Sequence, residues 1–289
     1  MEFDIKGDFS RRKFLVASTA GVGCLLGAGK FAESVGGLSK ILHKDAPLVP
    51  WSIGNYRFNI EEVKKRAYRN FFKYECMGGV ICTFLKMLSE NIGYPFNSLP
   101  LDMFRYGGGG IAGWGTVCGA VNGGSQLFNI LTYDRTPSKS TYNYISLIND
   151  LLDWYSNKSF PSIDHDGYAK FQNQAQSVSK SPLCHVSVTK WVNTARKIDN
   201  LNIRAKSPER ADRCAKVTGD VAGYIAQVLN NYYDGKYVKT FNDKNPEYST
   251  CVSCHLDTEN AYNPNVKAEM NCITCHEDIV KIDPATHPY

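Results

Sequence analysis

Two short motifs near the C-terminus constrain this chain more than any other feature. Cys251-Val252-Ser253-Cys254-His255 and Cys272-Ile273-Thr274-Cys275-His276 share the pattern Cys-x-x-Cys-His. This pattern is typical of covalent c-type haem attachment, in which two thiols bind the porphyrin and the following imidazole binds the iron. We therefore predict two haem c groups, attached through Cys251, Cys254, Cys272 and Cys275, with His255 and His276 as proximal iron ligands.

The same four cysteines also suit other chemistry, because two Cys-x-x-Cys pairs can bind zinc as four thiolates or form disulfides. The residue after each pair favours haem. A zinc site does not require His255 and His276, whereas haem attachment requires a histidine at both positions. The sequence around the motifs is too polar to bury an apolar core, so we expect the haems to supply much of the apolar centre of this segment.

The N-terminus has the features of an export signal. Ser10-Arg11-Arg12-Lys13-Phe14-Leu15 introduces an apolar, Gly- and Ala-rich stretch that extends to Gly29, a pattern typical of twin-arginine signals. The stretch is shorter than the roughly 20 apolar residues that a membrane-spanning helix needs. We predict export to the periplasm without stable membrane insertion after signal removal, the alternative being a retained N-terminal anchor. The expected organisation is a signal peptide at 1–32, a body at 33–240 and a dihaem segment at 241–289.

Charge and hydropathy exclude several classes of protein. Of 289 residues, 33 are Lys or Arg and 28 are Asp or Glu, which gives a formal charge of +5 at pH 7. Because this charge is small and scattered, nucleic acid is not an expected partner. A hydrophobic content of 43% and a mean hydropathy of −0.32 indicate a globular chain without several membrane spans. The sequence contains no nucleotide-binding loop and no recognisable hydrolytic catalytic set, so we name no catalytic residue.

The body has a helical hydrophobic pattern. Apolar residues recur every three, four or seven positions between 59 and 92, which predicts one long helix or two helices separated at Gly78-Gly79. Further helices are predicted around 139–156, 184–197 and 208–233, the last with Ser207 as its N-cap. Glycine is dense between 99 and 124, which indicates sharp turns or close backbone approach. The predicted fold class is mostly α: a helical body with a loop-rich C-terminal dihaem-binding tail.

Five cysteines remain after those of the signal and the haem motifs, and they suggest a second cofactor. They are Cys76, Cys82, Cys118, Cys184 and Cys214. Several fall near predicted helix starts or glycines, where backbone N–H groups can bond to cluster sulfurs, so an iron–sulfur cluster is one interpretation. Buried thiols that pack as small apolar groups are the other. The twin-arginine route carries proteins already folded in the cytoplasm, and this favours a cofactor inserted before export.

The second axial ligands of the haems are predicted from the remaining histidines, which are His43, His165, His185 and His287. We favour bis-His ligation, with His185 and His287 as the preferred ligands and His165 and His43 as weaker candidates. Two imidazole ligands would give a lower reduction potential than a methionine and an imidazole, because methionine ligation raises the potential.

These features together resemble a known family. The twin-arginine start, the cysteines of the body and the paired C-terminal haem motifs are similar to those of the split-Soret cytochromes c of sulfate-reducing bacteria. The body alone resembles a wider group of redox proteins marked by four cysteines and the motif Cys-Gly-Ala-x-x-Gly, found here at Cys118–Gly123. The segment Ser181-Pro182-Leu183-Cys184-His185 contributes to the resemblance.

The resemblance implies a mostly helical homodimer with four bis-His haems, in which a histidine of one subunit ligates a haem of the other. His185 would be the natural crossing ligand, because it lies in the body. The resemblance also implies an iron–sulfur centre, which we expect to be a [2Fe–2S] cluster, bound by Cys76, Cys118, Cys184 and Cys214, with Cys82 left over.

We therefore expect electron transfer between redox partner proteins in the periplasm, in which haems and cluster carry single electrons. The expected protein is a carrier and not an enzyme. Two alternatives remain: a multihaem oxidoreductase with one haem iron open to substrate, and a redox-sensing or assembly subunit.

Overall fold

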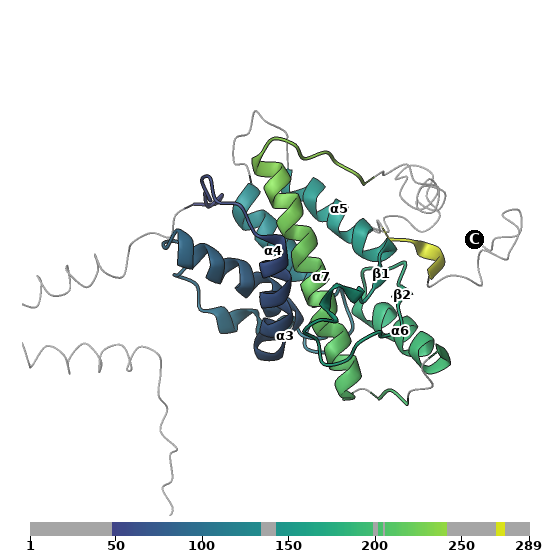
Figure 1. Cartoon of the computed structure of the whole chain (residues 1–289). Helices are drawn as coiled ribbons and strands as arrows, with labels where there is room; N and C mark the ends of the chain where they lie inside the picture. The colour runs from purple at the N-terminus through teal and green to yellow at the C-terminus, as the bar shows by residue number, and fades with distance from the viewer. Residues whose placement is uncertain (1–47, 134–142, 199–201, 205, 242–269, 275–289) are drawn as a thin grey trace, which may run out of the picture. The chain divides into compact units, whose positions relative to one another are not determined.

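Figure 1 shows the structure of the chain, a computed structural model. It describes residues 48–133, 143–198, 202–204, 206–241 and 270–274, all within the unit Leu48–Tyr289. The predicted signal peptide, the first haem motif and most of the tail lie outside the described residues, as do Cys275 and the histidines His43, His276 and His287.

Helices dominate the described residues, which confirms the predicted mostly-α fold class. The α-helices are α3 (Ile60–Asn91), α4 (Gly119–Thr132), α5 (Asn143–Asn157), α6 (Cys184–Ile198) and α7 (Pro208–Tyr233). Short 3-10 helices are η1 (Leu101–Gly107), η2 (Ile163–His165) and η3 (Cys272–Thr274). Strands β1 (Ser159–Phe160) and β2 (Ser177–Val178) form one antiparallel pair, with Ser159 opposite Val178 and Phe160 opposite Ser177.

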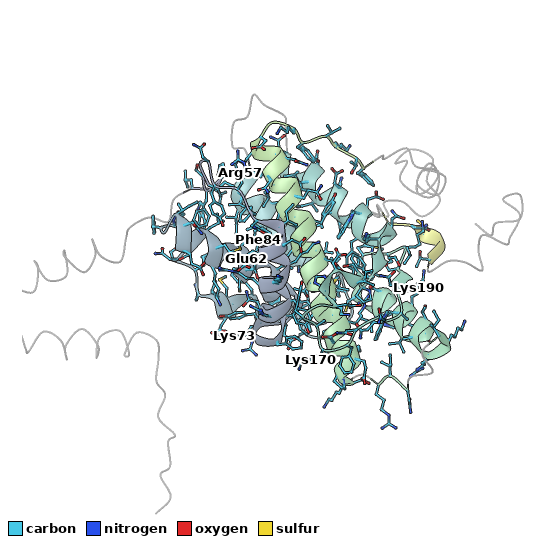
Figure 2. All side chains as sticks on the ribbon, in the orientation of Figure 1. Arg57, Glu62, Lys73, Phe84, Lys170 and Lys190 are labelled. Carbon is cyan, nitrogen blue, oxygen red and sulfur yellow. The ribbon has the colours of Figure 1, made fainter. Side chains whose placement is uncertain are left out.

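The core lies where α3 packs along α7 and against α4 (Figure 1). Phe84 of α3, labelled in Figure 2, is completely buried between the helices, whereas Lys73 and Lys170 lie at the periphery. Helix α6 has a small apolar cluster of its own, formed by Ala175, Trp191, Ala195 and Ile203. The helices that surround the body cysteines therefore belong to two packing groups.

Helix α3 is interrupted at Glu75 and not at Gly78-Gly79. Glu75 has φ +62° and ψ −172°, a conformation that side-chain-bearing residues rarely adopt. The glycines instead allow close packing: a Cβ on Gly79 would lie 2.7 Å from Cγ2 of Thr218 in α7. The interruption directly precedes Cys76, so it sets the direction in which that thiol leaves the helix.

The starts and ends of α3, α5, α6 and α7 agree with the sequence predictions to within about four residues. Helix α4 was not predicted, because its first residues belong to the glycine-rich segment 99–124, which indicated turns. Ser207 occupies the N-cap position of α7, as predicted, but its hydroxyl accepts a hydrogen bond from the Arg204 N–H at 2.6 Å and caps no helix N–H. Asn59 caps α3 through its side chain, which accepts from the Glu62 N–H at 3.0 Å.

The cap at Asn59 gives a first testable prediction. Asn59→Ala leaves the Glu62 N–H without its side-chain partner, and we expect a loss of about 1 kcal/mol of stability. For a chain of this size this corresponds to a fall of about 2–4 °C in the midpoint of thermal unfolding. Asn59→Asp, which keeps an acceptor at the same position, serves as the control and should retain most of the wild-type midpoint; an equal fall in both variants would contradict a capping role.

The end of α7 is attached to α5 through the buried carboxylate of Asp150. It accepts hydrogen bonds from the Tyr237 hydroxyl at 2.7 Å and from the backbone N–H groups of Thr240 and Phe241, at 3.1 and 2.7 Å. These bonds fix the point at which the chain leaves the helical body toward its C-terminal tail. None of the helices in the described ranges is long and apolar enough to cross a membrane.

Candidate metal centre

Four of the five body cysteines lie close together where α3, α4, α6 and α7 begin or bend. Cys76 follows the interruption in α3, Cys118 is the N-cap of α4, Cys184 is the first residue of α6, and Cys214 lies in the second turn of α7. The thiols of Cys76 and Cys214 are hydrogen-bonded, and Cys118 and Cys184 are near enough to raise the pKa of Cys76. This grouping is the set named from the sequence.

Backbone pairing places Cys118 beside Cys184. The Cys118 N–H donates to the Pro182 carbonyl at 2.9 Å, and the Cys184 N–H donates to the Thr116 carbonyl at 2.7 Å. Val117 and Leu183 form the antiparallel bridge between these two bonds. The end of the glycine-rich segment is thus held against the loop before α6, although about 65 residues separate the two in the sequence.

Gly119 allows a third segment to approach the same point. A Cβ at this position would lie 2.0 Å from the backbone oxygen of Gly107, at the end of η1, and 3.0 Å from Cβ of Cys76. No side chain fits into that space. The start of α4, the end of η1 and the bend of α3 therefore meet more closely than any other residue at position 119 would permit.

A cavity of about 440 Å³ opens beside the thiols. Its wall includes Cys76, Cys184 and Cys214 but not Cys118. The other lining side chains combine two aromatic rings with charged and polar groups: Phe71, Phe72, Glu75, His185, Lys206 and Arg210. Three of the four thiols can thus be reached from a partly apolar, partly basic cavity.

The four thiols differ in how readily they lose a proton. The hydrogen bond with Cys76 and the charges of Arg213 and Arg210 lower the pKa of Cys214, against the effect of burial. The hydrogen bond with Cys214 and burial raise the pKa of Cys76, and burial raises the pKa of Cys184 to about 12. Cys214 is therefore the thiol best prepared to bind metal as a thiolate.

Arg213 is a buried cation beside these thiols. Its side chain donates from Nη2 to the Ser187 hydroxyl at 2.7 Å, and the residue is only 2% exposed. Its Nε has no hydrogen-bond partner, and within the described ranges no carboxylate forms an ion pair with it. A buried cation without a carboxylate needs another anionic group close by, and a set of metal-bound thiolates would supply that negative charge.

The thiols interact with one another without forming the ligand geometry of a single ion. Among the residues that the structure describes, no group of three His, Cys, Asp or Glu side chains is arranged to hold one metal ion. The donor set, four soft sulfur atoms next to a buried cation, fits an iron–sulfur cluster, in which bridging sulfides and more than one iron separate the ligands.

Cys82 lies apart from the other four. It is completely buried, its thiol donates to the Leu101 carbonyl at 3.5 Å, and burial raises its pKa to about 12. The charged groups that affect this pKa are Lys86, Asp102 and Lys73, and no cysteine is among them.

The two histidines within the described ranges have contrasting surroundings. His185 follows Cys184, is exposed and lines the cavity, and its backbone N–H donates to the Gly115 carbonyl at 3.1 Å. His165 is completely buried, with Nε2 2.8 Å from an Asp220 carboxylate oxygen and Nδ1 2.6 Å from the Tyr168 hydroxyl. Both ring nitrogens of His165 are occupied, so its imidazole has a structural role here.

Of the haem motifs, the structure describes only Cys272–Thr274, which form η3. The Thr274 hydroxyl donates to the Lys180 carbonyl at 3.0 Å. The first motif, with Cys251, Cys254 and His255, and the end of the second, Cys275 and His276, lie outside the described residues, as does His287.

Sequence reasoning did not identify the polar groups behind the thiols. Arg213 donates to the Ser187 hydroxyl, whose oxygen also lies 3.0 Å from the Tyr155 oxygen, and Tyr155 is hydrogen-bonded to Cys118. The available signal was a charged residue directly before Cys214, on the otherwise apolar face of a helix. Tyr155 and Ser187 belong to α5 and α6, and nothing in the sequence links them to Cys118.

Two comparisons with known proteins agree on one relative. The chain is similar to the split-Soret cytochrome c of Desulfovibrio desulfuricans, with 27% identity over 275 residues, covering 92% of this chain and 94% of the relative. It is also similar to the solved structure described as "A novel iron centre in the split-Soret cytochrome c" from that organism. The TM-score is 0.67 at 28% identity, over 82% of this chain and 93% of that one.

A protein-family profile described as "Putative redox-active protein (C_GCAxxG_C_C)" matches residues 74–228, a span that contains Cys76, Cys118, Cys184 and Cys214. In the pattern of the family name, Cys stands directly before Ala. Here Gly119 stands before Ala120, and Cys118 precedes Gly119. Because the match covers more than half of its length, the chain belongs to the C_GCAxxG_C_C family of redox-active proteins.

Proposed function

We propose that this chain is a periplasmic electron-transfer protein that carries two haem c groups and one iron–sulfur cluster. The observation that carries the proposal is the grouping of Cys76, Cys118, Cys184 and Cys214 beside the buried Arg213, on a chain that also has two Cys-x-x-Cys-His motifs. The relative from Desulfovibrio desulfuricans supports it, because its name and the description of its structure combine a cytochrome c with an iron centre.

The cluster would be a [2Fe–2S] cluster held by these four thiolates. Such a cluster stores one electron at a time, and its potential depends on net charge, on hydrogen bonds to its sulfurs and on exposure to solvent. The chain contributes the ligands, the cation of Arg213 and the Tyr155 hydroxyl near Cys118. The cavity leaves one side of the site accessible from outside.

The haems would be attached through Cys251, Cys254, Cys272 and Cys275, with His255 and His276 as proximal ligands. His185 and His287 are the proposed distal ligands. His185 is exposed at the start of α6, so an iron held by another chain can reach it, which supports a homodimer with a crossing ligand. His165 drops out of the candidates because Asp220 and Tyr168 occupy both of its ring nitrogens.

Export would follow the twin-arginine route, which suits a chain that acquires its cluster before translocation. After removal of residues 1–32 we propose that the protein works in the periplasm without a membrane anchor. There it would take single electrons from one redox partner protein and pass them to another, with no bond made or broken in a substrate.

One purified sample tests the proposal. Two haems with a [2Fe–2S] cluster give an iron-to-haem ratio of about two, whereas haem alone gives about one. Iron is measured by elemental analysis, and haem by the absorbance of its pyridine complex. A ratio near one would remove the cluster from the proposal.

Carbon monoxide distinguishes a carrier from an oxidoreductase with an open haem. If both haem irons have two histidine ligands, the reduced native protein should show no change in its visible spectrum when carbon monoxide is added. Protein unfolded at acid pH and then reduced is the positive control. Rapid binding by the native protein would favour the oxidoreductase.

A further inference from the structure

We infer that Arg213, Ser187 and Tyr155 form a hydrogen-bonded relay behind the thiolates that raises the reduction potential of the cluster. This inference rests on the proposed function, since it assigns a positioning role to three side chains around the proposed cluster. None of the three is a ligand. Their contribution would be electrostatic, and it would act more strongly on the cluster than on the haems.

The relay connects three helices through buried side chains. Arg213 is on α7, Ser187 on α6 and Tyr155 on α5, and they are 2%, 1% and 0% exposed. The Ser187 oxygen is 2.7 Å from Arg213 Nη2 and 3.0 Å from the Tyr155 oxygen. Each end of the relay is in contact with a cysteine: Arg213 with Cys214, and Tyr155 with Cys118.

The available hydrogens determine the direction of the relay. A guanidinium can only donate, and a hydroxyl has one hydrogen and two lone pairs. Ser187 accepts from Arg213, so its own hydrogen is free to point at the Tyr155 oxygen, since the 3.0 Å separation suits donation in either direction. Tyr155 can then direct its hydrogen to the Cys118 sulfur. Hydrogen bonds that follow one direction polarise one another, so the Arg213 charge also strengthens the hydrogen bond from Tyr155 to the Cys118 sulfur.

Arg213 is held in place independently of any cofactor. Its guanidinium carbon lies 5.9 Å from the centroid of the Trp191 ring, and the Trp191 N–H donates to the Ala175 carbonyl at 2.8 Å. Ser187 lies one turn after Cys184 on α6, and its backbone N–H donates to the Leu183 carbonyl at 3.0 Å. The relay is therefore preorganised around the thiols, with no rearrangement needed when the charge of the cluster changes.

The sign of the effect follows from charge. Reduction adds one negative charge to a cluster that is already anionic, so a fixed cation and N–H or O–H donors at its sulfurs favour the reduced form. Among the described residues no carboxylate forms an ion pair with Arg213, so no such partner cancels its charge. Arg213 should therefore be the largest contributor, with Tyr155 second.

The test is a redox titration of purified full-length protein, with the cluster followed by electron paramagnetic resonance and the haems by absorbance. In Arg213→Met we expect the ratio of reduced to oxidised cluster at a fixed potential to fall about tenfold, which is about 59 mV for a one-electron couple. Tyr155→Phe and Ser187→Ala should lower the ratio severalfold, and Arg213→Lys should recover part of the loss. The haem potentials are recorded in the same titration and should shift less than the potential of the cluster, even though His185, a proposed haem ligand, lines the same cavity.

Arg57→Met is the matched control. Arg57 pairs with Asp234 at the C-terminal end of α7, about 30 Å along the helix from Arg213, and Figure 2 shows it at the opposite end of the body from Lys170, whose backbone N–H contacts Asp212. Arg57→Met removes one guanidinium charge, as Arg213→Met does, but far from the thiols. Equal shifts in Arg57→Met and Arg213→Met would overturn the inference, because the effect would then be one of net charge.

The remaining outcomes separate the inference from the proposed function. A wild-type protein without a cluster overturns the proposed function. A wild-type cluster with the same potential in Arg213→Met and Tyr155→Phe overturns the relay only. Circular dichroism shows whether Arg213→Met folds. If it does not, the cluster potentials of Tyr155→Phe and Ser187→Ala test the relay, because each substitution removes a hydroxyl and leaves the buried charge in place.

Discussion

Cys214→Ala should abolish the iron–sulfur signal and reduce the iron-to-haem ratio from about two to about one, while Cys82→Ala should leave both unchanged. Cys214 is the thiol whose pKa is lowered by Cys76, Arg213 and Arg210, so its loss removes the ligand best prepared as a thiolate. It also removes the thiolate whose charge acts most strongly on the buried guanidinium of Arg213. The haem motifs are separate in sequence, so haem content should not change.

Cys82→Ala is the matched control, because Cys82 is also buried in the core and also a thiol. Its contact is the Leu101 carbonyl, away from the other cysteines. The measurements are iron and haem content and the electron paramagnetic resonance spectrum of the reduced protein. Loss of the cluster in Cys82→Ala, or its retention in Cys214→Ala, would show that a different set of four cysteines binds it.

Gly119→Ala should destabilise the protein by about 1–3 kcal/mol or more, because its Cβ would overlap the Gly107 carbonyl. The obstacle is backbone, which cannot rotate aside as a side chain can. Relief requires η1 or α4 to move, and both position Cys76 or Cys118. We therefore expect a lower midpoint of thermal unfolding and a reduced yield of bound cluster in the same variant.

Gly167→Ala should stabilise the protein, in contrast to Gly119→Ala. A Cβ on Gly167 meets nothing within 4 Å, and the residue is not in the left-handed region. The same substitution there reduces the freedom of the unfolded chain and should stabilise by about 0.4–1 kcal/mol. Differential scanning calorimetry of both variants, with iron analysis of Gly119→Ala, makes the comparison. A Gly119→Ala protein with normal stability and full cluster content would contradict the close approach at Gly107.

Four of the five α-helices in the described residues could be predicted because their signals are local, whereas α4 was missed because it begins inside the glycine-rich segment. Helix α7 begins and ends at the predicted residues, since Pro208 and the apolar face of 208–233 lie within the helix itself. The interruption of α3 could not be predicted in the same way. Gly78-Gly79 looked like a break, but these glycines pack against Tyr74 and Thr218, and the strained residue is Glu75. Only contacts with η1 and α7 distinguish the two positions.

The candidate site was predicted in part. Thiols near helix starts and beside glycines suggested a cluster, and the family resemblance implied which four cysteines bind it; the structure groups the same four and separates Cys82. The pairing of Cys118 with Cys184 depends on main-chain hydrogen bonds, which leave no mark on side-chain identity. Arg213 could not be recognised as fully buried, because in sequence it resembles Arg210 one turn earlier, which is only half-buried.

The backbone pairing between 116–118 and 182–184 determines which sequence changes the centre can accept. The two bonds that hold these segments together run from N–H to carbonyl, so the side chains of Thr116, Val117 and Leu183 do not enter them. Exchange of the Val117 and Leu183 side chains therefore leaves these two bonds in place, whereas the Thr116 hydroxyl also accepts a hydrogen bond from the Ile111 N–H at 3.1 Å. A single inserted or deleted residue shifts the pairing and turns one thiol to the opposite face. In these segments the identity of the side chains between the paired backbone groups can vary, whereas the number of residues before each cysteine cannot.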